Sequence, residues 1–286
     1  MKANKLKLGD WYQNAKIYLE QDRDEPTSSI LALAGHILKS SPAFILAHPE
    51  RALTAFEIDE LTRMLDRLKS GEPLAYIIKR QAFFGMDFYV DPSVLIPRPE
   101  TEILVEQALS WLRHKDIYTV ALEAGTGSAC IPISICMNFQ KVSFFTFEIS
   151  TNAIQIAKIN ISNFRLTDQI QLIKTNSCSC FKPGFNLICA NLPYIPTERL
   201  ESLQVSKFEP GIALDGGKDG LFIIKEFLSQ SSFLLQNPGL LLCEIDYTQK
   251  DSLIQLSHEL FHDASISIVN DLSKFSRVLR IETGAH

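Results

Sequence analysis

The stretch Leu122–Ala129 reads LEAGTGSA and follows an apolar run that predicts a buried strand over 117–122. Gly125 and Gly127 permit a tight turn and let the backbone approach a ligand closely. A helix is expected at about 128–138, so its first N–H groups point out of the turn toward that ligand. This strand–turn–helix unit predicts an α/β domain with a binding site at the carboxyl edge of its sheet.

Beyond this turn, apolar runs of strand length alternate with longer segments of helical spacing. The expected strands lie at 117–122, 142–147, 170–174, 186–190 and 239–245, and the expected helices at about 128–138, 151–163, 220–236 and 248–262. Such alternation predicts a largely parallel sheet. Two further strands at 265–269 and 277–281 are joined by a short polar segment. They predict a C-terminal antiparallel hairpin and bring the sheet to seven strands.

The first 80 residues have a different pattern, with apolar residues at helical spacing. Thr54 is a suitable N-cap for a long helix, and Gly71 suits the position just beyond its end. An aromatic segment with Gly85 at its turn then predicts a β-hairpin. The expected order is a small helical bundle at 1–81, a β-hairpin linker at 82–97 and a sheet-containing domain at 98–286.

The composition bounds the class of protein. The 286 residues are 46% hydrophobic and 21% charged, which is typical of a globular protein. There is no apolar run near the ~18 residues of a membrane span and no apolar leader, so we expect no membrane partner. Six cysteines, mostly in apolar stretches, favour reduced thiols in a cytoplasmic protein. Cys178 and Cys180 lack a second pair or a nearby histidine, so no metal site is expected.

The net charge of the chain indicates whether a nucleic acid is an expected partner. The chain carries 28 Lys and Arg against 33 Asp and Glu, a net charge of −5. Enzymes that bind a nucleic-acid duplex usually present a basic face. The acidic balance therefore predicts no direct nucleic-acid partner, and a monomer is the default expectation.

An acidic residue accompanies the glycine turn. Glu148 ends the second predicted strand, where a carboxylate can accept the hydroxyls of a ribose. A dinucleotide site would need a third glycine, but Cys130 stands there, and Glu123 would repel a pyrophosphate. Glu123 suits a cation instead. S-adenosylmethionine, with a ribose, an α-amino group and a sulfonium, fits this pair of carboxylates better than a dinucleotide does.

A second candidate site follows the fourth predicted strand, at Asn191-Leu192-Pro193-Tyr194. The Asn191 side chain offers an acceptor and two donors in one plane, Pro193 stiffens the turn, and Tyr194 adds a flat face. On its own this tetrapeptide also fits an ordinary turn that ends a strand. Beside the glycine turn, it predicts a receptor for a planar N–H₂ group next to a methyl donor, and hence N-methylation.

Three longer motifs carry a resemblance to a known family. They are Gly71–Ile77 (GEPLAYI), Val94–Glu102 (VLIPRPETE), and Phe208–Pro210 (FEP) with Ala213–Leu221 (ALDGGKDGL). With the tetrapeptide, the chain resembles the release-factor glutamine N5-methyltransferases (PrmC/HemK family) over most of its length. The resemblance implies a seven-stranded, Rossmann-like methyltransferase that uses S-adenosyl-L-methionine. It also implies methylation of the glutamine in the Gly-Gly-Gln motif of class 1 peptide chain release factors, an event of translation termination.

The resemblance also implies roles for individual residues. The cofactor-binding residues would be Glu123, Gly125, Thr126, Gly127, Ser128, Ala129, Glu148, Asn176, Ser177 and Asn191. The catalytic residues would be Asn191, Leu192, Pro193 and Tyr194, and these four would bind the substrate together with Arg98 and Glu100. The Asn191 Oδ1 and the Leu192 carbonyl would accept the two N–H bonds of the glutamine amide. The helical domain would dock the release factor.

Several positions depart from the family's usual pattern. Glu123 and Ala129 replace the ends of a motif that commonly reads Asp-x-Gly-x-Gly-x-Gly, and Glu148 stands where Asp is usual. Asn176 replaces a common acid near the adenine, and Leu192 replaces the first proline of Asn-Pro-Pro-Tyr. None of these changes removes a needed group. Ala129 is expected to be tolerated through a negative φ.

Two other functions remain open from the sequence. Adenine N6-methyltransferases of DNA and RNA also carry Asn-x-Pro-Tyr, but they need base flipping and a basic cleft. A non-catalytic S-adenosylmethionine-binding protein would keep the fold, but it would not need Asn191 and Tyr194.

Overall fold

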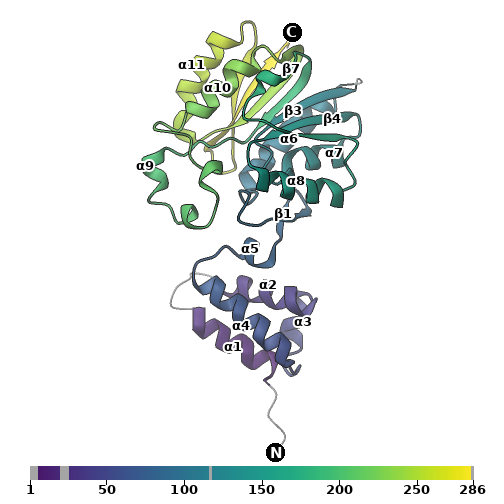
Figure 1. Ribbon diagram of the computed structural model, residues 1–286, viewed down its shortest axis with the longest axis vertical. Coiled ribbons are helices and arrows are strands. Elements are labelled where there is room, and N and C mark those ends of the chain that lie inside the picture. The colour runs from purple at the N-terminus through teal and green to yellow at the C-terminus, as the bar shows by residue number, and fades with distance from the viewer. Residues whose placement is uncertain (1–5, 20–25, 116–117, 285–286) are drawn as a thin grey trace, which may run out of the picture. The chain divides into compact units, whose positions relative to one another are not determined.

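The computed structural model describes residues 6–19, 26–115 and 118–284, and the chain divides into two compact units, Met1–Lys79 and Arg80–His286 (Figure 1). Residue 117, where the first strand was expected to begin, lies outside the described residues. Among the helices of the described segments, none is long and apolar enough to cross a membrane.

The first unit is helical, as its apolar spacing predicts. Its elements are α1 (Leu8–Leu19), α2 (Pro26–Leu38), α3 (Pro42–Ala47), α4 (Ala55–Lys69) and α5 (Leu74–Ile78). Buried residues of α1, α2 and α4, such as Leu8, Leu33 and Leu61, share one core. The expected N-cap of α4 is confirmed, because the Thr54 side chain accepts from Glu57 N while the Glu57 carboxylate accepts from Thr54 N. The short α3 was not expected; it begins because Ser41 caps it and Pro42 suits a first helical position.

The second unit begins with the hairpin of β1 (Gln81–Phe83) and β2 (Met86–Phe88). Gly85 lies in its turn, as expected, and has a φ of +72°. Phe83 and Phe88 are buried in the same core as residues of the large sheet. The hairpin therefore packs as part of the second unit.

The large sheet has seven strands and confirms the predicted fold class. They are β3 (Thr119–Ala124), β4 (Val142–Glu148), β5 (Ile170–Lys174), β6 (Phe185–Ala190), β7 (Leu235–Glu244), β8 (Ser265–Asn270) and β9 (Ser276–Thr283). Their order is β5-β4-β3-β6-β7-β9-β8. The first five strands pair in parallel, and β9 pairs antiparallel with both β7 and β8.

Helices cover both faces of this sheet (Figure 1). One apolar cluster joins the sheet to α6 (Glu102–Leu112), α7 (Cys130–Asn138) and α8 (Thr151–Asn163); the other joins it to α10 (Phe222–Ser231) and α11 (Lys250–Leu260). The loop after β6 holds the short α9 (Thr197–Leu200). The helix expected to reach residue 236 ends at Ser231, because Leu235 already begins β7 beside β6.

The sheet order brings the two predicted sites together. β3 pairs with β6 in parallel, and Ala124 lies opposite Ala190. The next residues, Gly125 and Asn191, therefore leave the sheet side by side at its carboxyl edge. This is a topological switch point, since β4 and β5 extend to one side of β3 and β7 to the other side of β6.

One buried side chain ties this edge to the segment that follows the hairpin. Asn160 on α8 is fully buried, and its Nδ2 donates to the carbonyls of Ser128 (2.9 Å) and Tyr89 (3.0 Å). Its Oδ1 accepts from Tyr89 N at 2.8 Å. The glycine turn is thus held from behind by an asparagine that uses both ends of its amide.

Asn160→Ala is expected to lower the free energy of unfolding by about 3 kcal/mol, because it leaves several buried backbone groups unpaired. The exposed Asn163→Ala on the same helix is the matched control, with an expected change within about 0.5 kcal/mol. Urea unfolding monitored by circular dichroism measures both. Equal stability of the two variants would contradict the assigned role of Asn160.

Candidate active site

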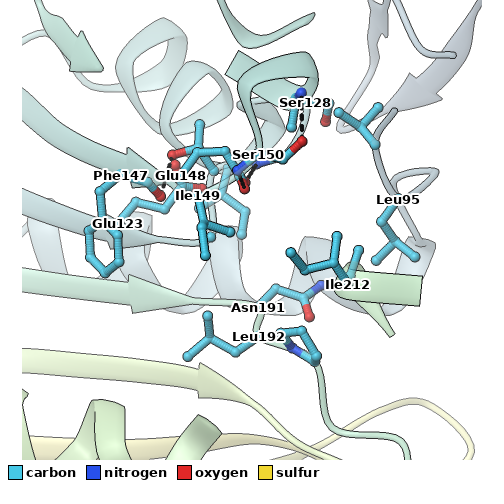
Figure 2. A pocket seen from close by; sticks show the side chains of 18 of the residues that line it. Leu95, Glu123, Ser128, Phe147, Glu148, Ile149, Ser150, Asn191, Leu192 and Ile212 are labelled. Atoms are coloured by element: carbon cyan, nitrogen blue, oxygen red, sulfur yellow. Dashed lines mark hydrogen bonds between the residues drawn. The ribbon is translucent and has the colours of Figure 1, made fainter. Parts of the chain in front are cut away.

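A cavity of about 380 Å³ opens between the glycine turn and the tetrapeptide (Figure 2). Glu123, Ser128 and Glu148 border it on one side, and Asn191 and Leu192 on the other. Thr126 and Gly127 of the turn also line it. The two stretches that the sequence singled out therefore face one space.

The two glycines of the turn adopt conformations that favour glycine. Gly125 and Gly127 have φ angles of +71° and +53°. The Gly125 N–H donates to the Phe147 carbonyl at 3.0 Å, which joins the turn to the end of β4. A Cβ on Gly125 would lie 3.0 Å from the Leu192 side chain. The missing side chain at Gly125 thus allows Leu192 to pack against the turn.

Ala129 corrects an expectation, because its φ is +63° rather than negative. The residue is fully buried, and its N–H donates to the Thr126 carbonyl at 2.8 Å, closing the turn in the left-handed region. A residue with a Cβ pays roughly 1–2 kcal/mol for that backbone geometry. The turn is retained in spite of this cost, because its hydrogen bonds hold it.

Glu148 organises the turn as well as facing the cavity. Its Oε2 accepts from Gly127 N at 3.0 Å, and its Oε1 accepts from Ser150 N at 2.8 Å. Ser150 in turn caps α8 by accepting from Ala153 N at 3.2 Å. Each carboxylate oxygen has a second lone pair, so Glu148 can still accept the hydroxyls of a ribose.

Glu123 is the one acidic cavity residue with a buried oxygen that lacks a partner among the described residues. It is 1% exposed, and its Oε2 accepts no hydrogen bond there. Burial, reinforced by the charge of Glu148, raises the pKa of Glu123 well above its usual value. A buried carboxylate in this state is stabilised by a cation with N–H donors. The α-amino group of S-adenosylmethionine meets that requirement, so the cavity fits the expected cofactor.

The segment after β5 supplies the next wall of the cavity. Thr175 and Asn176 line it, as does Glu226 of α10. Ser177 was expected to bind the cofactor, but it is not among the described residues that line either cavity. Its hydroxyl instead donates to Gln230 Oε1 at 2.9 Å and accepts from Ser179 N at 3.1 Å. Ser177 is therefore committed to capping its own short turn.

The tetrapeptide separates two cavities. Asn191 and Leu192 line both, Pro193 lines the first, and Tyr194 lines a second cavity of about 290 Å³. The second cavity is also lined by Arg98, Glu100, Glu244 and Arg277. A planar group that entered the second cavity could therefore reach Asn191, which also lines the first cavity.

Two polar residues that the sequence did not single out contact the tetrapeptide. Asn191 Nδ2 donates to Thr101 Oγ1 at 3.0 Å, and Thr101 Oγ1 donates to Glu244 Oε2 at 2.7 Å. The Tyr194 hydroxyl donates to Glu244 Oε1 at 3.1 Å. The available signal was that Glu244 ends β7, the strand beside β6, and that Thr101 lies within Val94–Glu102, the proline-rich loop.

The loops above the site are braced by charge and by close backbone contact. Arg98 pairs with Glu209, a buried carboxylate that also accepts from Ile96 N at 3.1 Å. A Cβ on Gly216 would lie 2.8 Å from Tyr194 Cα, so that glycine permits close approach to the tetrapeptide. Arg98 thus joins the proline-rich loop to the loop after β6, while it also lines both cavities. Within the described residues, no cluster of His, Cys, Asp or Glu could hold a metal ion.

Comparison with known proteins gives three consistent results. The PrmC N-terminal domain family matches residues 10–78. A release factor glutamine methyltransferase of Koribacter versatilis is 35% identical over 280 residues, covering 96% of this chain and 98% of that protein. One of Clostridium botulinum is 33% identical, covering 87% of this chain and 89% of that protein. A methyltransferase structure from Pyrococcus furiosus shares the fold, with a TM-score of 0.54 and 17% identity over 78% of this chain and 99% of that chain.

Glu123→Gln is expected to change how stability depends on pH. The folded-state pKa of Glu123 is raised, so the folded protein keeps a proton that the unfolded chain releases above pH about 4.5. Wild-type stability therefore falls as pH rises from there toward the folded-state pKa. The variant lacks this loss and should therefore be more stable than the wild type at neutral pH.

Thermal unfolding of the cofactor-free proteins between about pH 5 and 8 measures the effect. The exposed Glu106→Gln on α6 is the control and should follow the wild-type curve. Calorimetry with S-adenosylmethionine should show weaker binding to Glu123→Gln. A wild-type pH slope together with wild-type cofactor affinity would refute the assignment of Glu123.

Ala129→Gly should change stability by less than about 1 kcal/mol, because relief of the left-handed conformation offsets the loss of a buried methyl group. The matched control is Ala157→Gly at a fully buried helical position of α8. It should cost about 1–2 kcal/mol, since it loses both the methyl group and helix propensity. Urea unfolding compares the two. Equal destabilisation would mean that Ala129 bears no conformational cost.

Proposed function

The chain belongs to the release factor glutamine methyltransferase family, and we propose that it methylates the N5 amide nitrogen of glutamine in the Gly-Gly-Gln motif of class 1 peptide chain release factors. The observation that carries this proposal is the position of Asn191 between two cavities. One cavity has the carboxylates that suit S-adenosylmethionine. The other is lined by Tyr194.

The methyl donor is held by the first cavity. S-adenosylmethionine supplies an electrophilic methyl group when it is bound. Glu123 would accept its ammonium group, Glu148 its ribose hydroxyls, and the Asn176 Oδ1 its adenine amine. Thr126, Gly127 and Ser128 would border the bound cofactor, whereas Ala129, which was also expected to bind it, is fully buried and is not among the described residues that line the cavity. These contacts would hold both ends of the cofactor in the cavity that Asn191 also lines.

The tetrapeptide would hold the substrate amide through hydrogen-bond acceptors. The Asn191 Oδ1 and the Leu192 carbonyl would each accept one N–H of the glutamine side chain. The lone pair of an amide nitrogen is delocalised, so its orientation toward the methyl group is the main task of the enzyme. Such positioning can contribute roughly 7–11 kcal/mol. Leu192 serves as well as a proline, because only its backbone carbonyl takes part, and Pro193 holds the turn.

Tyr194 would cover the amide and exclude water rather than act as a base. Its hydroxyl donates to Glu244, and burial, followed by the charge of that carboxylate, raises its pKa far above the usual value. The phenol therefore stays protonated at neutral pH. The amide nitrogen can lose its proton to solvent after transfer, so no side chain is required as a general base.

The substrate-docking role falls to surfaces outside the two cavities. A protein substrate needs contact area beyond one side chain. The helical unit, taken as 1–81 with the hairpin 82–97 leading to the catalytic domain 98–286, would supply part of that area. Arg98 and Glu100 would border the substrate entrance. We further propose that the enzyme acts as a cytoplasmic monomer, with no direct nucleic-acid contact.

The assay of function is transfer of a labelled methyl group from S-adenosylmethionine. We expect label on a class 1 release factor, no label on its Gly-Gly-Gln→Gly-Gly-Ala form, and none on DNA or RNA. Label on nucleic acid alone would instead identify an adenine N6-methyltransferase. Absence of label on every substrate would identify a binding protein without this activity.

Asn191→Ala should lower kcat by about 10²–10³, as for loss of one oriented group at a transition state. Cofactor binding, measured by calorimetry, should persist, because Glu123 and Glu148 remain. A variant that binds cofactor and methylates the release factor at the wild-type rate would remove Asn191 from the mechanism.

A further inference from the structure

We propose that Glu244 and Thr101 are positioning residues that set which way the Asn191 amide faces, and that Glu244 also holds the ring of Tyr194. This inference rests on the proposed function, since it concerns how that site presents its acceptor. It assigns a role to two residues that lie outside the tetrapeptide and the glycine turn.

The three residues come from separate parts of the second unit. Thr101 lies where the proline-rich loop meets α6, Glu244 is the last residue of β7, and Asn191 follows β6. Thr101 and Glu244 are each 2% exposed. Because both side chains are this deeply buried, an unmade hydrogen bond here would be costly.

The direction of the hydrogen bonds follows from the number of protons available. An ionised carboxylate only accepts, so Thr101 must donate its single hydroxyl proton to Glu244 Oε2. The Thr101 oxygen can then only accept from Asn191, and the group facing it must be the N–H₂. The Oδ1 of Asn191 therefore faces away from Thr101.

This direction matters because the substrate is itself an N–H₂ group. If the Asn191 amide were reversed, its N–H₂ would oppose the N–H₂ of glutamine, and two donors would meet. The two orientations of an asparagine amide are almost identical in shape. Packing alone cannot select between them, whereas a chain of hydrogen bonds that ends on a carboxylate can.

Glu244 also contacts the tetrapeptide directly. Its Oε1 accepts from the Tyr194 hydroxyl, whereas its Oε2 is linked to Asn191 only through Thr101. Burial and the charge of Glu100 raise the pKa of Glu244, while the Thr101 and Tyr194 hydroxyl donors and nearby Arg277 act in the opposite direction and favour the ionised form. The carboxylate can thus remain an acceptor for both contacts.

The test uses Thr101→Val, which removes the hydroxyl but keeps a branched side chain, and Thr101→Ser, which restores the hydroxyl. Thr101→Val should lower kcat about ten-fold, the effect of one lost hydrogen bond. Its dissociation constant for S-adenosylmethionine should stay at the wild-type value. Thr101→Ser should recover most of the lost rate. Glu244→Gln should lower kcat at least as far, because the added N–H₂ permits the reversed direction and disturbs Tyr194.

The matched control is Thr119→Val. Thr119 is fully buried at the start of β3, and its hydroxyl has no hydrogen-bond partner among the described residues. This variant should keep the wild-type kcat. Circular dichroism establishes that each variant is folded; if Glu244→Gln is not, the Thr101 pair decides the question.

The outcomes separate this inference from the proposed function. A wild-type enzyme that does not label the release factor would overturn the function itself. A wild-type enzyme that labels it, with Thr101→Val as fast as Thr119→Val, would overturn the positioning role alone. Equal rates for Thr101→Ser and Thr101→Val would also overturn it, because a steric effect would then explain the loss.

Discussion

The parallel pairing of β3 with β6 is the constraint on which the site depends. Because Ala124 lies opposite Ala190, the glycine turn and the tetrapeptide emerge next to each other. The order of the sheet makes this edge a switch point, so the loops on either side diverge and leave a cavity. Neither stretch alone would form a methyl-transfer site. Their adjacency is a property of the fold, supported from behind by Asn160.

Two buried carboxylates at this edge, Glu123 and Glu244, differ in their hydrogen-bond partners. Glu123 lines the first cavity and has one oxygen without a hydrogen-bond partner among the described residues, which suits it to a cation that arrives with the cofactor. Glu244 has both oxygens occupied by hydroxyl donors and serves the protein itself. We therefore propose that the first carboxylate binds the cofactor and that the second positions the Asn191 amide. Burial raises the pKa of both, but only Glu123 remains without a local donor for one of its oxygens.

Local signals in the sequence were sufficient for most of the fold. The seven strands, the Thr54 cap and the adjacency of Gly125 and Asn191 follow from patterns a few residues long combined with the rule for parallel sheets. The Thr101–Glu244 contact joins residues 143 positions apart, so no local pattern could indicate it. The predicted negative φ of Ala129 was wrong, because the hydrogen bonds of the turn override the preference of alanine for negative φ. Ser177 follows the cavity residue Asn176 in the sequence, but its hydroxyl caps a short turn, and the sequence alone did not distinguish these two roles.

The most direct measurement is the affinity of the enzyme for a full-length release factor and for the same factor with its motif glutamine changed to glutamate, by calorimetry. The docking surfaces are common to both, so the difference reports the side-chain site. If Asn191 and Leu192 present two acceptors, glutamate should bind at least about a hundred-fold more weakly, since its carboxylate offers no donors. Equal affinities would contradict recognition of the amide by acceptors and with it the orientation assigned to Asn191.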